Sequence, residues 1–184
     1  DFESGIFSKH LEQVDAFHEI EKPTFEGTEV KKDSWRICDI RWLRFYQKNY
    51  EWLFERLDKK IKEINKKVFQ FDLTDPITIE DLQFTKYNEG GLYKRHTDWN
   101  GMDPEYSTRK ISFTINLSCP VNDWSGDGLF VEVPGNTGDN TNPFIDKSQG
   151  SITFFPSFIS HEALPVESGT RYCIVGWIHG NPFR

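Results

Sequence analysis

The pattern of apolar residues changes at Ile77, and this change constrains the fold more than any other feature of the sequence. From there to the C-terminus, short runs rich in β-branched and aromatic residues alternate with glycine- and proline-containing turns, a pattern typical of strands. The predicted strands are 77–87, 92–97, 111–118, 129–133, 151–155 and 171–178. Six short strands after a helical region predict an α+β, mainly β fold, built as a sandwich or jelly roll.

One amphipathic helix is predicted before this β region. Apolar residues recur there at spacings of three or four, which places them on one face of a helix. These residues are Leu53, Leu57, Ile61, Ile64 and Val68. The segment 35–43 (WRICDIRWL) predicts a strand, or a strand with a bend, and the first thirty residues indicate a short amphipathic piece and a polar loop. We expect one domain over 1–184, in which 1–76 is a helical support region and 77–178 the β core.

The composition narrows the classes of function and location. Aromatic residues make up 15% of the chain, enough for a packed core, and the net charge of −7 counts against a nucleic-acid partner. No apolar run is long enough to cross a bilayer, and the N-terminus lacks the apolar stretch of a signal peptide. It also lacks an initiator methionine, so we expect that it is trimmed or that residues are missing from it. We expect a cytoplasmic protein with no membrane partner, in which Cys38, Cys119 and Cys173 are buried, reduced thiols.

The first candidate for chemistry is the run His96-Thr97-Asp98. On an extended strand, residues two apart point to the same side, so this imidazole and this carboxylate can bind one ion together. They supply two thirds of the 2-His-1-carboxylate triad that holds Fe(II) and leaves coordination positions open. An isolated His-x-Asp is weak evidence, because a histidine at a strand end beside a solvated aspartate has the same sequence.

A candidate for the third ligand lies in the last quarter of the chain. His161 follows the predicted strand 151–155, and the last strands of a jelly roll can return beside the early ones. The competing interpretation is that His161-Glu162 begins the HExxH helix of a zinc protease. It is excluded because Pro165 occupies the fifth position and would break that helix.

An arginine opens the last predicted strand. Arg171 follows Gly169-Thr170, ten residues after His161. A buried guanidinium needs a partner, and a dicarboxylate cofactor offers planar, two-pronged pairing that lysine cannot copy. The alternative is a salt bridge to one of the 29 acidic residues, which is the more common situation for an arginine considered alone.

Together, the His-x-Asp, the distal His161 and Arg171 follow the order seen in 2-oxoglutarate oxygenases, and the surrounding sequence resembles the prolyl 4-hydroxylase family. The similar segments are 83–91 (QFTKYNEGG), 93–98 (YKRHTD), 111–118 (ISFTINLS), 126–129 (GDGL) and 150–171 (GSITFFPSFISHEALPVESGTR). The resemblance covers roughly 77–178, and 1–76 is similar, more loosely, to the support region of bacterial and phage members. It implies a double-stranded β-helix, or jelly roll, with N-terminal supporting helices.

The resemblance also implies roles for individual residues. The residues that match the iron ligands are His96, Asp98 and His161. Arg171 matches the residue that pairs with the distal carboxylate of 2-oxoglutarate. Tyr87 matches a tyrosine that helps to enclose this cofactor, although a packed strand aromatic is an equal interpretation. A second cofactor-contacting tyrosine of some relatives has no counterpart on 111–118, where Asn116 falls.

The activity that the resemblance implies is oxidation of a C–H bond with Fe(II), 2-oxoglutarate and O2, giving succinate and CO2, with ascorbate as a candidate reductant. No catalytic residue is expected beyond the metal centre. The expected substrate is a prolyl residue in a protein or peptide, and a free amino acid or small metabolite is the alternative. A non-catalytic jelly-roll binding module is the alternative from a different class, although such a module would be expected to have lost one of the four site residues.

Two predicted loops are long for such a domain and are expected to flank the metal site as mobile lids. They span 99–109 and 134–149, and loops of this length usually carry function. Trp99, directly after the His-x-Asp, either walls the substrate entrance or fills the core. His179, past the last predicted strand, is expected at the surface.

Overall fold

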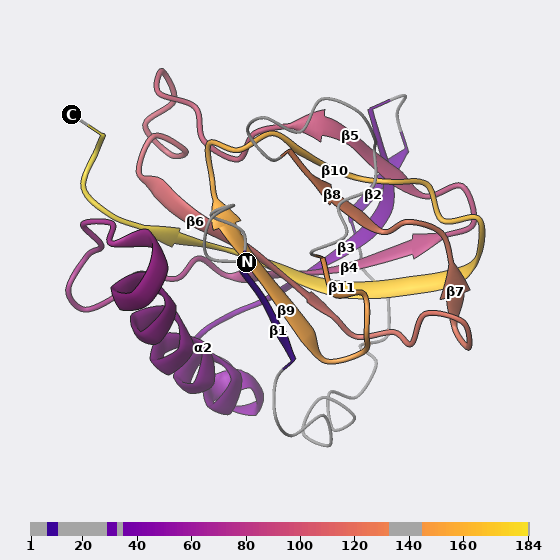
Figure 1. Ribbon diagram of the computed structural model, residues 1–184, viewed down its shortest axis with the longest axis horizontal. Helices are drawn as coiled ribbons and strands as arrows, with labels where there is room; N and C mark the ends of the chain where they lie inside the picture. Colours follow the sequence, from indigo (N-terminus) through magenta and orange to yellow (C-terminus); the bar gives the residue numbers. More distant parts are fainter. Residues whose placement is uncertain (1–6, 11–28, 33–34, 133–144, 184) are drawn as a thin grey trace.

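The fold is an antiparallel β-sheet with a helix packed on its outer face (Figure 1). The computed structural model describes residues 7–10, 29–32, 35–132 and 145–183. In this part of the chain, nine strands lie in the order β1-β9-β6-β11-β4-β3-β5-β10-β8, while β2 pairs with β3 and β7 with β11. The predicted α+β, mainly β class is confirmed.

The strands are short, apart from the last. They are β1 (Phe7–His10), β2 (Glu29–Lys32), β3 (Arg36–Leu43), β4 (Leu82–Asn88), β5 (Leu92–His96), β6 (Arg109–Asn116), β7 (Trp124–Ser125), β8 (Leu129–Val131), β9 (Ser151–Pro156), β10 (His161–Ala163) and β11 (Ser168–His179). The sheet curls toward closure, because Val131 of β8, at one end of the strand order, packs against Phe155 of β9, near the other end.

One α-helix in the described residues covers the outer face of the sheet. It is α2 (Glu51–Ile64), which follows a 3-10 turn (Lys48–Tyr50) and continues into a π-helical turn (Asn65–Phe69). Its buried residues are Leu53, Leu57, Ile61 and Ile64, four of the five predicted for the apolar face, and Val68 packs beside them partly buried. The predicted amphipathic helix is therefore confirmed.

Alternation along the strands divides the interior into an apolar layer and a polar pocket. On β6, Ile111, Phe113 and Ile115 belong to the apolar core under α2, and each is followed by a polar residue that is also buried. Those polar residues are Ser112, Thr114 and Asn116. β11 pairs with β6 without a shift from Cys173 to Ile178 and alternates in the same way, and its Arg171 and Cys173 reach the pocket. The period of two thus directs polar side chains to one enclosed space.

Most predicted elements correspond to observed ones, with informative differences. The segment 77–81 makes only an isolated bridge, between Ile79 and Ile178, so β4 starts at Leu82. β7 and β10 were not predicted, because two or three residues show too little alternation. β8 is equally short and was predicted only as part of the longer run 129–133. The expectation for the first thirty residues falls largely outside the described residues. Of that segment the structure describes only β1 and the start of β2.

The cysteines and the helices bear on two further expectations. Cys38 and Cys173 are buried free thiols, as predicted. Cys119 is also free but only half-buried, because it follows β6 in a turn rather than on a strand, so the expectation of burial was wrong there. Among the residues that the structure describes, no helix is long and apolar enough to cross a membrane.

Candidate metal centre and adjoining pocket

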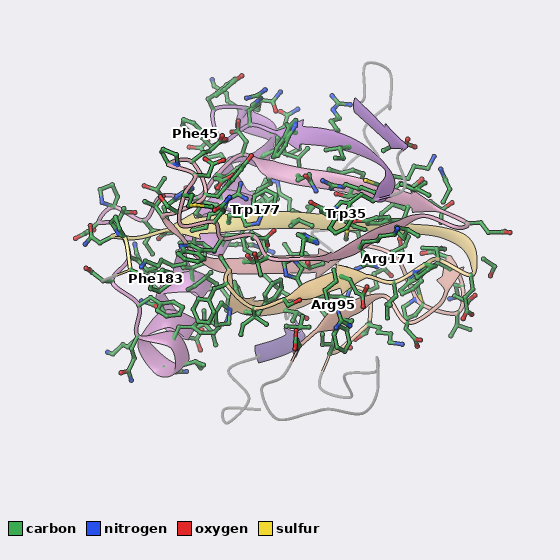
Figure 2. All side chains as sticks on the ribbon, turned by 90° about the horizontal axis from the view of Figure 1, so that it is seen from above. Trp35, Phe45, Arg95, Arg171, Trp177 and Phe183 are labelled. Carbon is green, nitrogen blue, oxygen red and sulfur yellow. The ribbon has the colours of Figure 1, made fainter. Side chains whose placement is uncertain are left out.

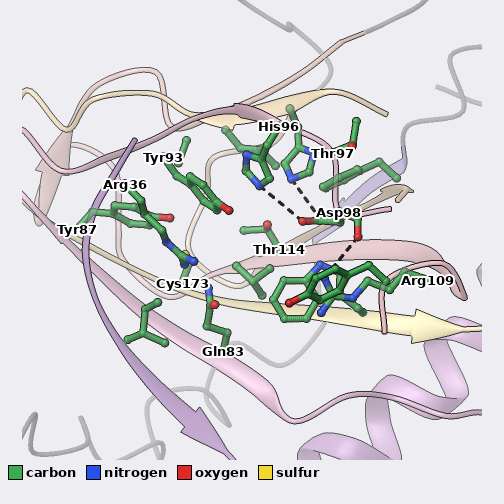
Figure 3. Close-up of a pocket in the computed structure, with 18 of the residues that line it drawn as sticks. Arg36, Gln83, Tyr87, Tyr93, His96, Thr97, Asp98, Arg109, Thr114 and Cys173 are labelled. Carbon is green, nitrogen blue, oxygen red and sulfur yellow. Dashed lines mark hydrogen bonds and ion pairs between the residues drawn. The ribbon is translucent and has the colours of Figure 1, made fainter. Parts of the chain in front are cut away.

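The pairing of β5 with β10 brings two distant histidines together. His96 is the last residue of β5, and it lies opposite His161, the first residue of β10. Asp98 follows His96 by two residues, and the possible ligand atoms of all three lie within 4.8 Å of one another. Figure 3 shows His96 and Asp98 together at one end of the pocket. The structure thus assembles the three predicted residues into a group that could hold a metal ion.

Hydrogen bonds to the backbone fix which nitrogen each imidazole offers. His96 Nδ1 lies 2.7 Å from the carbonyl oxygen of Lys94, and His161 Nδ1 lies 3.0 Å from that of Ile159. A carbonyl oxygen only accepts, so both Nδ1 atoms carry the proton and donate. Both Nε2 atoms are then the nitrogens available for a metal, and they face Asp98 at 3.6 Å (His96 to Oδ1) and 3.3 Å (His161 to Oδ2).

The charges of these groups suit metal ligation. Burial alone would raise the pKa of the Asp98 carboxyl, but His161 and His96 hold that pKa well below its usual range. Burial would lower the pKa of His161, but the adjacent Asp98 carboxylate raises it above its ordinary value. Asp98 is therefore an anion at neutral pH, and a metal ion would compete with a proton for His161 Nε2.

Arg171 lies in the same pocket as the three candidate ligands. The cavity has a volume of about 410 Å³, and Tyr87 also lines it. Figure 2 shows Arg171 and Trp177 along β11, which contributes both to the pocket wall. Tyr87 is buried, and burial raises the pKa of its phenol, so it is a neutral wall residue.

The guanidinium of Arg171 is buried with an amide as its hydrogen-bond partner. Its Nη2 donates to Asn116 Oδ1 at 3.0 Å, and its carbon lies 5.7 Å from the Tyr87 ring centroid and 5.5 Å from that of Trp124. Its buried Nε has no hydrogen-bond partner among the described residues. Within that part of the chain Arg171 makes no ion pair, so the salt-bridge alternative finds no partner there.

Comparison with known proteins identifies the family. The profile of the 2OG-Fe(II) oxygenase superfamily matches residues 82–179, more than half of the 184 residues and all of the predicted site. This chain belongs to the 2OG-Fe(II) oxygenase superfamily. A PKHD-type hydroxylase from Crocosphaera subtropica is 36% identical over 106 residues, which are 56% of this chain and 45% of that protein. The chain thus spans about half the length of the curated relatives it matches.

Solved structures of this superfamily share the fold. A prolyl-4-hydroxylase from Pseudomonas putida superposes with a TM-score of 0.73 at 20% identity, covering 97% of this chain and 94% of that one. A prolyl hydroxylase from Trichoplax adhaerens, in complex with a peptide fragment of hypoxia inducible factor, gives 0.69 at 17% identity, covering 96% and 84%. At these identities the likeness shows the fold, and it confirms the predicted jelly roll.

The residues present fit the two groups that this superfamily's name implies. Two Nε2 atoms and one carboxylate form the 2-His-1-carboxylate set that suits non-haem Fe(II). The Arg171 Nε, buried and without a partner among the described residues, fits an arriving carboxylate of 2-oxoglutarate. The pocket therefore has one end suited to a cation and another suited to an anion.

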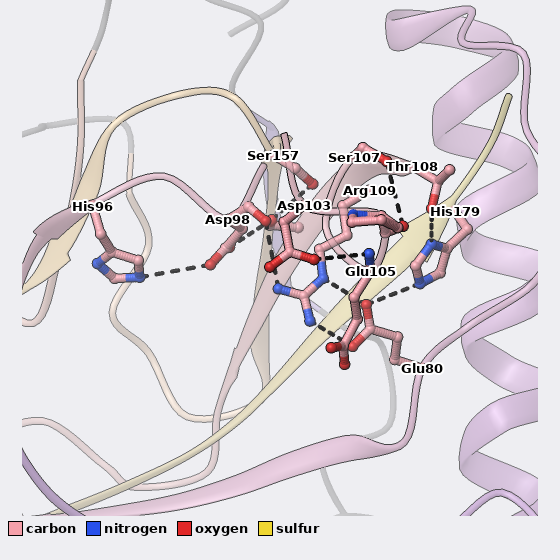
Figure 4. Close-up of polar contacts among 12 residues, drawn as sticks. Glu80, His96, Asp98, Asp103, Glu105, Ser107, Thr108, Arg109, Ser157 and His179 are labelled. Atoms are coloured by element: carbon pink, nitrogen blue, oxygen red, sulfur yellow. Dashed lines mark hydrogen bonds and ion pairs between the residues drawn. The ribbon is translucent and has the colours of Figure 1, made fainter. Parts of the chain in front are cut away.

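A second arginine, which sequence reasoning missed, supports the backbone of Asp98. Arg109 Nε and Nη2 donate to the two carboxylate oxygens of Glu80 at 2.5 and 2.6 Å, and Nη1 lies 3.4 Å from the carbonyl oxygen of Asp98 (Figure 4). The guanidinium carbon lies 4.4 Å from the Tyr106 ring and 4.2 Å from the Trp177 ring. Burial would raise the pKa of Glu80, but hydrogen bonds from His179 and Arg109 lower it below its usual value.

His179 belongs to this network, which corrects its expected place at the surface. It is partly buried, with Nε2 2.9 Å from Glu80 Oε1 and Nδ1 2.8 Å from Thr108 Oγ1. β11 runs one residue further than predicted, and a register shift there sets His179 opposite Arg109. The carboxylate accepts, so His179 Nε2 donates to Glu80, and Nδ1 makes the second hydrogen bond of the ring with the Thr108 hydroxyl.

A stack of three side chains adjoins the candidate ligands. The Tyr93 ring stacks on the His96 ring with 3.7 Å between centroids, and Arg36 lies over the Tyr93 ring at 4.3 Å. Arg36 and Tyr93 both line the pocket, and they are opposite each other where β3 pairs with β5. The predicted strand 35–43 offered a signal for this placement. Its residues Arg36, Ile40 and Trp42 lie even numbers of positions apart, so they share one side of the strand, and all three line the pocket.

The two long loops have different outcomes. Asn100, Tyr106 and Arg109 line the pocket, so the loop 99–109 borders the site as expected. Most of 134–149 lies outside the described residues, so its expected position stays a prediction. Trp99 packs edge-on against Phe183, and its indole N–H donates to Ser107 O at 2.9 Å, which favours the packing interpretation over an entrance wall.

Proposed function

We propose that this chain is an Fe(II)- and 2-oxoglutarate-dependent dioxygenase that hydroxylates a C–H bond. In this proposal His96, Asp98 and His161 hold Fe(II), and no other residue takes a direct part in the chemistry. The observation that carries it is the placement of these three residues and of Arg171 in one pocket. Membership of the superfamily supports the same assignment.

Arg171 would hold the distal carboxylate of 2-oxoglutarate. Its bond to Asn116 holds Nη2, while Nε has no hydrogen-bond partner among the described residues and would be left to donate to a ligand. Asn116 is itself anchored, since its amide donates to Ser151 Oγ at 3.0 Å and to Asp146 O at 3.2 Å. This anchoring lowers the ordering cost of binding, because the guanidinium is held before the ligand arrives. Tyr87 would enclose the cofactor as a neutral, buried wall.

Iron and 2-oxoglutarate together, when bound, would supply the reaction with O2, giving succinate and CO2, with ascorbate as a candidate reductant. The protein supplies orientation and shields the site from water. The chain's own contribution is the fixed tautomer of His96 and His161, the anionic Asp98 and the apolar walls. Those walls include Leu129 and also Phe155, whose ring packs beside His161.

The proposed substrate is a prolyl residue in a protein or peptide. Trp42, Tyr106 and Trp177 line the pocket, and the Trp42 and Trp177 rings lie 6.3 Å apart. Aromatic-lined grooves suit proline, whose ring is apolar and already restricted in conformation. Trp42 is 36% exposed, so the aromatic wall reaches the surface, where a polypeptide could enter. The Trichoplax adhaerens relative was solved with a peptide, which is consistent with this class.

The test compares substrate classes under identical conditions. Protein loaded with Fe(II) and 2-oxoglutarate is incubated with proline-containing peptides, free L-proline or no substrate, and succinate and product mass are measured. We expect succinate release coupled to the gain of one oxygen atom with a peptide. Coupled turnover of the free amino acid alone would favour the small-metabolite alternative. If no cofactor binds and no succinate forms, the non-catalytic module becomes the better account.

A further inference from the structure

The carboxylate of Asp98 is held on its buried side by a serine that no metal motif includes. Ser112 Oγ lies 2.7 Å from Asp98 Oδ2, and Ser157 Oγ lies 3.0 Å from Ser112 Oγ. Both serines are fully buried, and Asp98 is 8% exposed. Ser112 comes from the pocket side of β6, and Ser157 directly follows β9. Three distant parts of the chain therefore meet at one carboxylate.

The chemistry of the three groups sets the direction of both hydrogen bonds. A carboxylate only accepts, and a serine hydroxyl has one hydrogen. Ser112 must therefore donate to Asp98, and the hydrogen between the two hydroxyls must come from Ser157. A bond to an ionised acceptor is shorter and stronger than one between neutral groups, which agrees with the 2.7 Å and 3.0 Å separations.

Ser157 also holds the backbone that carries Asp98. Its carbonyl oxygen accepts the N–H groups of Asp98 at 3.0 Å and Trp99 at 3.1 Å, and its own N–H donates to Lys110 O at 3.0 Å. Ser157 lies four residues before His161, so one residue links the segments that carry two of the candidate ligands. The hydrogen bonds that join Ser157, Ser112 and Asp98 through their side chains, together with the backbone bonds, fix both the position and the plane of the carboxylate.

We propose that Ser112 and Ser157 are positioning residues for the metal ligand Asp98. Their hydroxyls hold Oδ2 so that the carboxylate is turned toward the two Nε2 atoms before a metal arrives. This inference rests on the proposed function, since it assumes that the triad binds a metal. Partners of this kind commonly change metal affinity by about 10- to 100-fold when they are removed.

The chain offers a matched control. Ser118, just after β6, is also buried (2% exposed), and its hydroxyl accepts the N–H of Tyr172 at 2.7 Å, with no contact to the triad. Ser118→Ala therefore removes a buried serine hydroxyl from the same region of the fold. Ser112→Thr keeps the hydroxyl at position 112 and tests rescue.

The experiment measures Co(II) affinity of the full chain by competition with a chelator, together with the visible Co(II) spectrum and thermal unfolding. We expect Ser112→Ala to weaken Co(II) binding about 10- to 100-fold, with an altered spectrum. Ser157→Ala should weaken it less, because the backbone bonds remain. Ser118→Ala should match the parent in affinity and spectrum, and Ser112→Thr should recover most of the loss.

Two outcomes would overturn the proposal. The first is that the Co(II) affinity of Ser112→Ala lies within about twofold of the Co(II) affinity of Ser118→Ala. Such a difference corresponds to less than about 0.5 kcal/mol of binding free energy. If Ser112→Ala does not fold, Ser157→Ala takes its place, and equality with Ser118→Ala overturns the proposal. Failure of the parent itself to bind Co(II) would instead contradict the proposed function, so the two failures are distinguishable.

Discussion

The two ends of the pocket differ in how far the protein satisfies its own polar groups. At the metal end, both Nδ1 atoms donate to backbone carbonyls and Asp98 Oδ2 accepts from Ser112. At the Arg171 end, the guanidinium donates one hydrogen bond to Asn116, and Nε has no hydrogen-bond partner among the described residues. The candidate metal ligands are therefore oriented by the protein in advance, whereas the Arg171 end would be completed by an arriving anion.

The largest expected effect comes from removing a ligand at the metal end. His161→Ala removes one of three candidate ligands and leaves Asp98 without its closest imidazole. We expect metal binding and succinate formation to be lost together, since all three ligands are needed to hold Fe(II) with coordination positions left open. Metal content and turnover measured on the same preparation check this. Parent-like metal occupancy in the variant would show that His161 is not a ligand.

The next effect separates the two ends. Arg171→Ala should weaken 2-oxoglutarate binding by about 30-fold to several thousand-fold, or ~2–5 kcal/mol, because it removes a buried, charge-assisted contact. Co(II) affinity should stay nearly unchanged, since no ligand is lost. Calorimetric titration of each component checks both statements. Arg171→Lys keeps the charge without the planar fork, so it should fall between parent and alanine. Unchanged 2-oxoglutarate affinity in Arg171→Ala would remove the basis of the cofactor assignment.

A smaller effect is expected at the Glu80–Arg109 pair behind Asp98. Glu80→Gln should destabilise the protein by about 2 kcal/mol at neutral pH. Breaking a fully buried ion pair costs ~3–5 kcal/mol, and the effect is smaller here because the Glu80 side chain is 20% exposed. The folded-state pKa of Glu80 is lowered. Its contribution is therefore fully present above the unfolded-state pKa of about 4.3 and is lost as pH falls through the folded-state value.

Urea unfolding across pH checks this prediction. The stability difference between parent and Glu80→Gln should shrink as the pH falls below about 4.3. Asp81→Asn is the control. It breaks the neighbouring ion pair between Asp81, whose side chain is 24% exposed, and Arg44, whose side chain is 48% exposed, and this pair has no link to Asp98. A difference that does not change with pH would contradict the role given to the Glu80 charge.

The smallest effect is expected beside His161 on the surface. Glu162 pairs with Arg95 at 3.0 Å, with side chains 18% and 45% exposed. Glu162→Gln should cost about 0.2–1 kcal/mol of stability, as exposed pairs do, and leave Co(II) affinity at the parent value. Co(II) titration measures the metal affinity of this variant, and urea unfolding measures its stability. A large loss of metal affinity would mean that the orientation of His161 depends on this pair, and not only on its bond to Ile159.

The sequence indicated the candidate ligands and the candidate cofactor arginine more readily than the residues that contact them. His96, Asp98, His161 and Arg171 could be proposed because residue type and order indicate roles for them, and the structure brings them into one pocket. Ser112, Ser157 and Glu80 were missed because their roles depend on which residue lies opposite which across β6, β9 and β11. Register of this kind is set by the whole sheet, and a shift of one residue would turn each side chain to the other face.

The helix and the main strands were predictable because their periods are long and regular. The apolar face of α2 repeats over four turns, and β6 alternates over eight residues. β10 carries His161 but has three residues, so no periodic signal exists to place it. Its position comes from pairing with β5 and β8, which only the assembled sheet determines.

The most direct test of the central claim, that one pocket binds Fe(II) at the triad and 2-oxoglutarate between the metal and Arg171, is an anaerobic titration followed by visible absorption. Fe(II) is added first and 2-oxoglutarate second, with the order reversed in a parallel sample. We predict a metal-to-ligand charge-transfer band that appears only when both are present, is absent in His161→Ala, and requires much more 2-oxoglutarate in Arg171→Ala. Absence of the band in the parent chain at saturating Fe(II) and 2-oxoglutarate would contradict the account.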